Sequence, residues 1–508
     1  MKHNLILTTL LIFSISLSAC DSVSNQANTS VDKFNTKTPT LTPIPPTETL
    51  EPTPAPPTIT PTITPTPTPD NHFYYLVQSG DTASALSLRF NVEWDEIIGA
   101  DNLSETNFLE PGVELYIPIN IEVPEEMPKL IPDVEFLYSL TAKDYDLYEL
   151  VESYDGYLNS YTEWFINYGL LTGVDLLSNI SRDNSINPKI TLALLQFNGN
   201  WIEGQEITDE DLLYPLGIEE GLQYNLFNQV ALAIDSLVMG YYGWRDGTLT
   251  ELTFTDGTIL VLDPNLNAGT VGIMYYFSVN HTQARWEEIL YGDDGFMTLY
   301  LDWYGDPWEN ELATAEHIPA DLEQPELILP FLRKQRWAFT GGPHGAWRFN
   351  SPWAGLDFAP GIGKPGCIEP VDQWVLASAS GVIARKSLGV IVLDLDGDGN
   401  ENTGWVLLYL HMNDTDHLEV GDTVEVTDKL GVPSCLGGRT TGIHIHLARK
   451  YNGEWMLADG PVPFNLGGWV AQRGEEPYDG LLIRGDEVIT AYESATDITI
   501  IVRGPDDP

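Results

Sequence analysis

The spacing of hydrophobic residues changes along the chain and predicts a helical region followed by a β region. Between residues 130 and 325, long segments carry apolar residues at helical spacing, for example 161–177 and 190–202. An Asn-Pro pair just before the second segment is typical of a helix start. Residues 249–262 differ, because two strand-like runs flank an Asp-Gly pair and predict a hairpin. We therefore expect a mainly helical domain at 130–325.

From residue 326 to residue 508 the chain breaks into short strand-like runs separated by Gly, Pro and Asp turns. Runs of this kind predict strands rather than helices. The runs are residues 374–378, 381–385, 390–395, 405–411 and 443–449. Together they predict an antiparallel all-β domain at the C-terminal end of a multidomain chain.

A shorter unit, residues 72–119, combines both kinds of spacing. It begins with a strand-like run at 75–77, continues with apolar residues at helical spacing up to Phe90, and ends with a second strand-like run at 115–118. A second helix is expected at 94–100. The order predicts a small βααβ fold.

The first 71 residues carry no pattern that could bury a core. Residues 21–71 are almost entirely Thr, Pro, Ser, Asn and acidic residues, which predicts an extended, disordered tether. Residues 1–20 have a positive start and an apolar stretch too short for a typical membrane span, and they end in Leu-Ser-Ala-Cys. This ending resembles a bacterial lipobox, which implies a lipoprotein signal peptide and lipidation of Cys20. The alternative is an ordinary secretory signal with an incidental Cys.

Composition narrows the choice of partners. The chain has 74 acidic and 24 basic side chains among 508 residues, which gives a net charge of −50. A field of that sign repels phosphate backbones, so we expect no nucleic acid partner. Cations and neutral glycans become better candidates.

Cysteine usage agrees with export. If Cys20 carries lipid, Cys367 and Cys435 remain as an even pair in an oxidising compartment. We therefore expect a disulfide between them.

Candidate chemistry is concentrated in residues 442–447, which read Gly-Ile-His-Ile-His-Leu. On a strand, residues two apart share a face, so His444 and His446 would project side by side. Two imidazoles placed in this way can divide the work, one binding a metal and the other moving protons. A bare His-x-His segment can also be an ordinary half-exposed strand.

Three further motifs precede this one in a fixed order. Gly355-Leu356-Asp357-Phe358-Ala359-Pro360, Tyr409-Leu410-His411 and Ser434-Cys435-Leu436-Gly437-Gly438 lead to His444-Ile445-His446. The ordered set resembles the zinc endopeptidases of the lysostaphin and β-lytic metallopeptidase family, which cut peptide bonds in peptidoglycan. The resemblance covers roughly residues 336–460 and implies a zinc peptidase domain.

The first metal ligand departs from the common pattern of that family. Many members have a His four residues before the Asp, where this chain has Trp353, whose indole nitrogen is a donor only. His344 stands thirteen residues before Asp357 in a Gly-rich turn, which resembles the β-lytic and staphylolysin branch. The resemblance then implies three zinc ligands, His344, Asp357 and His446, with a fourth position left for water. It also implies that His411 and His444 accept the proton of that water and stabilise the oxyanion.

Residues 75–118 resemble the LysM module, which binds glycans that contain N-acetylglucosamine, such as peptidoglycan. The resemblance implies a shallow groove between the turn after the first strand and the loop before the last strand. Its residues would be Gly80, Asp81, Thr82, Leu109, Glu110 and Pro111. The alternative is a small βααβ spacer that has lost its ligand.

The helical region itself has only a faint resemblance. Residues 187–195 resemble the helix that leads to the catalytic Glu of lysozyme-like lytic transglycosylases, but Gln196 follows here. Gln cannot protonate a glycosidic oxygen. We therefore expect a spacer or a wall-binding domain without this activity.

Residues 394–400 read like the start of a calcium loop, with acidic residues at alternate positions. The twelfth position, where an EF-hand has Glu, is Trp405. We therefore expect a polar turn between strands that binds calcium weakly, if at all.

These features predict a lipid-anchored, zinc-dependent peptidoglycan endopeptidase that a LysM module concentrates on the cell wall. One alternative is a catalytically inactive wall-binding protein that regulates a separate amidase. The other is a lipoprotein that links wall and membrane structurally. A binding protein has no need for three ligands and two proton carriers, so a complete set favours the enzyme.

Overall fold

The computed structural model describes residues 71–507, with short gaps. The gaps are residues 102, 123, 166–167, 205, 220–223, 311–312, 314–316, 362–365 and 368–372. The described residues all belong to one compact unit of the chain. The predicted signal peptide, the lipidation site at Cys20 and the tether up to residue 70 lie outside the described residues.

Residues 72–118 form a two-stranded sheet with a helix packed on it. Strand β1 (His72–Leu76) pairs antiparallel with β2 (Glu114–Pro118), and α1 (Ala83–Phe90) lies between them in sequence. The expected second helix is only a 3₁₀ turn, η1 (Trp94–Glu96). The reason is that Ile98 pairs with Tyr116 of β2 through both backbone groups, so this segment cannot continue a helix. The βααβ prediction is therefore correct in order but wrong in the extent of the second helix.

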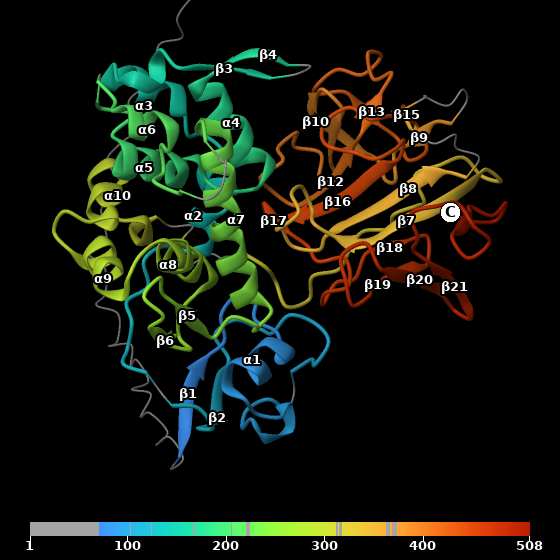
Figure 1. Cartoon of the computed structure of the whole chain (residues 1–508). Coiled ribbons are helices and arrows are strands. Elements are labelled where there is room, and N and C mark those ends of the chain that lie inside the picture. Colours follow the sequence, from blue (N-terminus) through green and yellow to red (C-terminus); the bar gives the residue numbers. More distant parts are fainter. Residues whose placement is uncertain are drawn as a thin grey trace, which may run out of the picture. The chain divides into compact units, whose positions relative to one another are not determined.

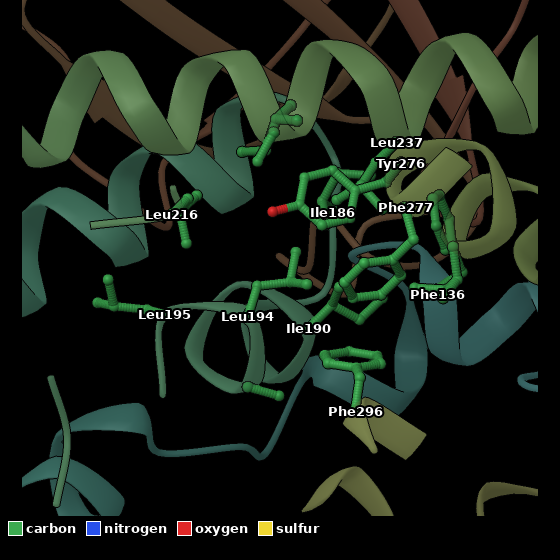
Figure 2. Close-up of a cluster of buried hydrophobic side chains, with 14 of the residues drawn as sticks. Phe136, Ile186, Ile190, Leu194, Leu195, Leu216, Leu237, Tyr276, Phe277 and Phe296 are labelled. Carbon is green, nitrogen blue, oxygen red and sulfur yellow. The ribbon is translucent and has the colours of Figure 1, made fainter. Parts of the chain in front are cut away.

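The middle region is mainly helical, as predicted. Its helices are α2 (Asp133–Phe136), η2 (Leu140–Ala142), α3 (Leu147–Tyr154), η3 (Tyr157–Asn159), α4 (Gly173–Asp183), α5 (Pro188–Gly199), α6 (Asp209–Leu213), α7 (Leu226–Arg245), α8 (Ala268–Asn280), α9 (Gln283–Tyr291), α10 (Phe296–Tyr304) and η4 (Pro307–Glu309). Helix α5 is apolar on nearly every side and is therefore buried among its neighbours. Figure 2 shows Ile190 and Leu194 of α5 in the same cluster as Phe277 of α8 and Phe296 of α10.

Two hairpins interrupt the helices. The predicted hairpin at 249–262 is confirmed as β5 (Glu251–Thr253) and β6 (Ile259–Val261). The helix expected from residue 161 is wrong, because β3 (Thr162–Phe165) and β4 (Gly169–Thr172) form a hairpin there. Phe165 packs on Phe227 at the start of α7, with ring centroids 5.1 Å apart. This contact between the two rings favours a strand hairpin over a helix in this segment.

The C-terminal region is antiparallel β, as predicted. Its main sheet has the order β14-β10-β11-β12-β16-β8-β7-β22, with β17 added beside β16. The strands are β7 (Arg336–His344), β8 (Gly355–Pro360), β10 (Gly381–Ser387), β11 (Val390–Asp394), β12 (Trp405–Leu410), β14 (Thr423–Val424), β16 (Ile445–Tyr451), β17 (Glu454–Trp455) and β22 (Ile500–Val502). A three-stranded sheet consists of β13 (Met412–Asn413), β15 (Lys429–Pro433) and β9 (Val375–Leu376). A four-stranded sheet consists of β18 (Asn465–Leu466), β19 (Trp469–Arg473), β20 (Gly480–Arg484) and β21 (Glu487–Thr490).

Strand β12 is buried along its whole length because both faces of the sheet are covered. Leu407 and Tyr409 enter one hydrophobic cluster, whereas Val406 and Leu408 enter another. Tyr242 of α7 packs against the second cluster. The helical region therefore covers one face of the sheet that carries the histidine motifs.

Arg245, the last residue of α7, connects three parts of the chain. Its Nε lies 3.0 Å from Glu454 Oε1 in β17, and its Nη2 lies 3.0 Å from Asp133 Oδ2 in α2. Its Nη1 donates to the carbonyl of Ser79, in the turn after β1. Helix α7 thus begins near the β3–β4 hairpin and ends at that turn (Figure 1). We call Arg245, Glu454 and Asp133 the charged junction.

The charged junction makes stability depend on pH in a defined window. Burial raises the pKa of Glu454, but Arg245 and His317 lower it more strongly, so that it falls from 4.5 to about 2. A depressed carboxyl pKa contributes stability above the unfolded pKa, and this contribution is lost as the pH falls through the folded pKa. Glu454→Gln should therefore lower the free energy of unfolding by about 3 kcal/mol above pH 5. The difference from wild type should shrink between about pH 4.5 and about pH 2.

Urea unfolding followed by tryptophan fluorescence at a series of pH values measures this difference. Glu251→Gln, at an exposed carboxylate of β5, serves as the matched control and should follow the wild-type curve. A wild-type minus Glu454→Gln difference that stays constant from pH 6 to pH 2 would contradict the assignment.

Candidate functional site

Three adjacent strands bring His344, Asp357 and His446 together. In the pairing of β8 with β16, Asp357 lies directly opposite His446. His344, expected in a turn, is instead the last residue of β7, which carries two register shifts before it reaches Gly355 of β8. Gly355 is required here, because a Cβ at this position would lie 2.2 Å from Cε1 of His446. The pairing of β7, β8 and β16, together with the close approach of Gly355 to His446, thus brings the three predicted ligands together.

The donor atoms of these three residues converge. Nε2 of His344 lies 3.0 Å from Nδ1 of His446 and 3.3 Å from Oδ1 of Asp357. Nδ1 of His446 lies 3.1 Å from the same Asp357 oxygen. All three residues are buried, and their donor atoms lie within 4.8 Å of one another. Two imidazoles and one carboxylate in this arrangement can hold a metal ion.

Backbone carbonyls orient both of these imidazoles. Nδ1 of His344 donates to the Gly342 carbonyl at 2.7 Å, and Nε2 of His446 donates to the Ala346 carbonyl at 2.8 Å. Each ring therefore presents the lone pair of its other nitrogen to the centre. Burial raises the pKa of Asp357, but His344 and His444 outweigh it and hold that pKa well below its usual range. The carboxylate is accordingly charged.

His411 and His444 lie beside this group, with their ring centroids 4.5 Å apart. Nδ1 of His411 donates to the Leu436 carbonyl at 2.7 Å, and Nδ1 of His444 donates to the Gly442 carbonyl at 2.8 Å. Nε2 of His444 lies 3.7 Å from Oδ2 of Asp357. Burial and His444 lower the pKa of His411 to about 3, so this ring is neutral at neutral pH. In both rings Nδ1 is bonded to a carbonyl, so Nε2 is the nitrogen that can accept a proton, and in His444 this atom lies next to Asp357.

The predicted disulfide is present and lies close to this pair. Cys367 and Cys435, 68 residues apart, are bonded. Cys435 immediately precedes Leu436, whose carbonyl orients His411. The Gly366 carbonyl, next to Cys367, accepts from the amide of Ile443, which precedes His444. The bond therefore connects the two segments that hold His411 and His444.

Tyr478 belongs to the site but was not found from the sequence. Its ring stacks on His344, with ring centroids 4.1 Å apart and planes at 22°. Its carbonyl accepts from the amide of Gly342, in β7, at 2.7 Å. It has a positive φ of 74°, which is uncommon for a bulky residue and is held by these contacts. The only sequence signal was an aromatic residue inside a turn-rich Glu-Pro-Tyr-Asp-Gly stretch.

Most of the six predicted glycan-binding residues are buried or hydrogen-bonded within the structure rather than open to solvent. Asp81 accepts from the Tyr75 hydroxyl at 2.6 Å, and Thr82 caps α1. Gly80 and Leu109 are also buried. Of this set, Glu110 is exposed and Pro111 is partly buried.

Two further motifs have plain structural roles. Oε1 of Gln196 accepts from the amides of Ile202 and Glu203, each at 3.1 Å, so it closes the end of α5. Asp394, Asp396 and Asp398 place their oxygens within 4.8 Å of one another in the turn between β11 and β12. Three loop amides donate to the buried Asp394. The polar turn is as expected, and its calcium affinity stays a prediction.

Comparison with known proteins identifies matching family models and relatives of this chain. Two family models match, the LysM domain over residues 75–118 and "LasA, N-terminal domain" over residues 129–319. Protease LasA of Pseudomonas aeruginosa is 22% identical over 306 residues, covering 56% of this chain and 68% of that protein. Beta-lytic metalloendopeptidase of Achromobacter lyticus is 28% identical over 141 residues, covering 26% of this chain and 35% of that protein.

Among solved structures, the chain is similar to the M23 metalloprotease pseudoalterin from the deep sea. The identity is 24% and the TM-score 0.29, with 35% of this chain and 99% of that chain covered. Together, the family models and the relatives confirm the resemblance to LysM modules and to the β-lytic peptidases. They also indicate a peptidase, since the relatives are named as a protease and a metalloendopeptidase.

Proposed function

We propose that this protein is a zinc-dependent endopeptidase that hydrolyses peptide bonds in peptidoglycan. The observation that carries the proposal is the convergence of His344, Asp357 and His446 with His411 and His444 at one place. Each of the four imidazoles has one nitrogen bonded to a backbone carbonyl, and in His344, His446 and His444 the other nitrogen lies within 3.7 Å of an Asp357 oxygen. A protein that only binds the wall has no use for such an arrangement.

The donor set fits zinc. Zn²⁺ prefers nitrogen and oxygen donors in a tetrahedral site, and a catalytic site provides three protein ligands and one open position. His344, Asp357 and His446 would hold the ion. When bound, zinc supplies a Lewis acid for the scissile carbonyl and lowers the pKa of water.

His411 and His444 would carry the proton. Each ring donates from Nδ1 to a carbonyl, so Nε2 is the atom free to accept a proton from the attacking water. Once protonated, the same nitrogen becomes a donor and can stabilise the oxyanion of the tetrahedral intermediate. The later transfer of this proton to the leaving amine completes the cleavage.

Tyr478 would restrain the first ligand. Because its ring stacks on His344, Tyr478→Ala should weaken the affinity for Zn²⁺ by about 10-fold to 100-fold, as expected for loss of a group that orients a ligand. Tyr478→Phe keeps the ring and should keep the affinity within about threefold, well inside that loss. Competition with a chelating dye measures both values. Equal losses in the two variants would show that the hydroxyl, and not stacking, is what matters.

The location of the enzyme is part of the proposal. We place it outside the cytoplasm, anchored by lipid on Cys20 and reaching the wall through the tether at 21–71 and the LysM module. The match to LysM modules supports the contact with the wall. In the described part of the chain, none of the helices has the length and apolar character of a membrane span.

The test uses the full chain and purified peptidoglycan. The protein should carry one zinc per chain and release soluble fragments with new amino termini, and 1,10-phenanthroline should stop the release until Zn²⁺ is restored. Mass spectrometry of the products distinguishes cleaved peptide bonds from cleaved amide or glycosidic bonds. Release of no fragments by the zinc-loaded protein would leave the regulator or the structural lipoprotein as the better account.

A further inference from the structure

The face of the LysM module that would bind glycan is covered by another segment of the same chain. This segment, residues 317–322, follows the helical region and leads to the β domain. Ser79, in the turn after β1, contacts both backbone groups of Ile318. Its Oγ accepts from the Ile318 amide at 2.8 Å and donates to the Ile318 carbonyl at 3.2 Å. We call residues 317–322 the cover segment.

The chemistry of this contact matches that of the expected ligand. N-acetylglucosamine carries one amide, with one N–H donor, one carbonyl acceptor and an apolar methyl group. Ile318 offers the same combination, an amide N–H, a carbonyl and an apolar side chain that is fully buried. The cover segment therefore presents to Ser79 the same kinds of group that an N-acetyl group would present.

The opposite wall of the groove is also closed. Phe108, next to the predicted groove residue Leu109, packs in one hydrophobic cluster with Ile318 and Leu322 of the cover segment. Trp405 and Met456 of the β domain belong to the same cluster. The apolar surface that could stack on a sugar ring is thus used for contacts within the chain.

The turn itself is held from the other side by the charged junction. A Cβ added to Gly80 would lie 2.2 Å from Nη1 of Arg245, so the guanidinium lies directly on this glycine. A cavity of about 470 Å³ remains at the edge of the module. It is lined by Leu103, Ser104, Asn107, Phe108 and Glu110 of the module and by Pro319, Ala320 and Asp321 of the cover segment. This is the opening at which a glycan chain would first meet the groove.

We propose that the cover segment is an internal ligand of the LysM module, so that its docking and the binding of an N-acetylglucosamine chain are mutually exclusive. The proposal rests on the glycan specificity assigned under the proposed function. Glycan then binds only when Ile318 leaves Ser79. Binding of the module to the wall glycan thus releases the cover segment from Ser79.

A reversible crosslink tests this directly. Ser79→Cys/Ile318→Cys should form a disulfide under oxidising conditions, which mass spectrometry of non-reduced peptides identifies. Titration calorimetry with the pentamer of N-acetylglucosamine should detect no binding to the crosslinked protein and binding after mild reduction. Wild-type protein under the same reductant is the control. Equal binding by both redox forms, or failure of the two cysteines to join, would overturn the proposal.

A single substitution tests the same point without a crosslink. Ile318→Asp places a charge in the apolar cluster and should raise the affinity for the pentamer at least tenfold over wild type. Ile259→Asp makes the same change at an exposed position of β6 and should not alter the affinity. An Ile318→Asp variant that binds no tighter than wild type, including one that does not bind, would overturn the proposal.

These experiments distinguish failure of this inference from failure of the proposed function. Zinc-dependent release of wall fragments without any binding of the pentamer would sink this inference alone. Redox-controlled binding of the pentamer without wall cleavage would sink the peptidase assignment alone.

Discussion

Replacing His344 with alanine should remove zinc and peptidase activity together. Nε2 of His344 lies 3.0 Å from His446 Nδ1 and 3.3 Å from Asp357 Oδ1, so it completes the donor set. With two protein ligands left, zinc affinity should fall by more than about 100-fold, the upper range for loss of a group that merely orients a ligand. The zinc-to-protein ratio after dialysis, measured by plasma mass spectrometry, should approach zero. Release of wall fragments should stop in the same samples.

The matched control is His417→Ala. His417 lies in the same domain and is exposed, with Nε2 bonded to the Lys429 carbonyl at 2.9 Å. It should keep one zinc per chain and full activity. His317→Ala should also keep zinc, because His317 contacts Glu454 and not the ligand set. Stoichiometric zinc in the His344 variant would show that the metal is held elsewhere.

Replacing His411 should instead separate zinc from activity. His411 has a positive φ of 65°, a conformation that Asn tolerates, so His411→Asn removes the imidazole with little backbone strain. The variant should retain one zinc per chain and lose activity by about 10²-fold to 10⁴-fold, the usual contribution of a general acid or base. Zinc content and the initial rate of fragment release measure the two effects. Loss of zinc in this variant would make His411 a ligand.

A double variant tests whether His411 and His444 act as one unit. Residues that act together have non-additive effects, so His411→Asn/His444→Ala should be little worse than the more damaging single variant. Losses that multiply would mean that each ring performs an independent step.

The proximity of His344, Asp357 and His446 could be predicted because the motifs follow a recognisable order along the chain, and strand register then brings them together. Asp357 opposite His446 follows from the pairing of β8 with β16, and the sequence pattern predicted β16 as a strand. The local form of His344 was not predicted, since the register shifts that make its Gly-rich segment part of β7 depend on the partner strand. Register shifts leave the order of the motifs along the chain unchanged, but they change the local backbone conformation.

The features that were missed all depend on contacts between distant residues. Tyr478 meets His344 through the loop between β19 and β20, and no motif connects the two. The apolar spacing of 161–172 suits a helix, but packing of Phe165 on Phe227 selects a hairpin. The LysM pattern describes the module alone, so it predicts an open groove. Ile318, which contacts Ser79 through both backbone groups, lies 239 residues further along the chain.

The charged junction bears on how such chains can be assembled in evolution. A module that is exchanged as a separate unit must have a surface that tolerates exposure to water, as in LysM modules on flexible tethers. Here the guanidinium of Arg245 is shared between the Ser79 carbonyl, Glu454 and Asp133. A foreign module inserted at 72–118 would have to present a carbonyl at the same place, or leave part of a buried cation without its partner. We therefore expect exchange of the module at this boundary to be disfavoured unless the incoming module supplies such a carbonyl.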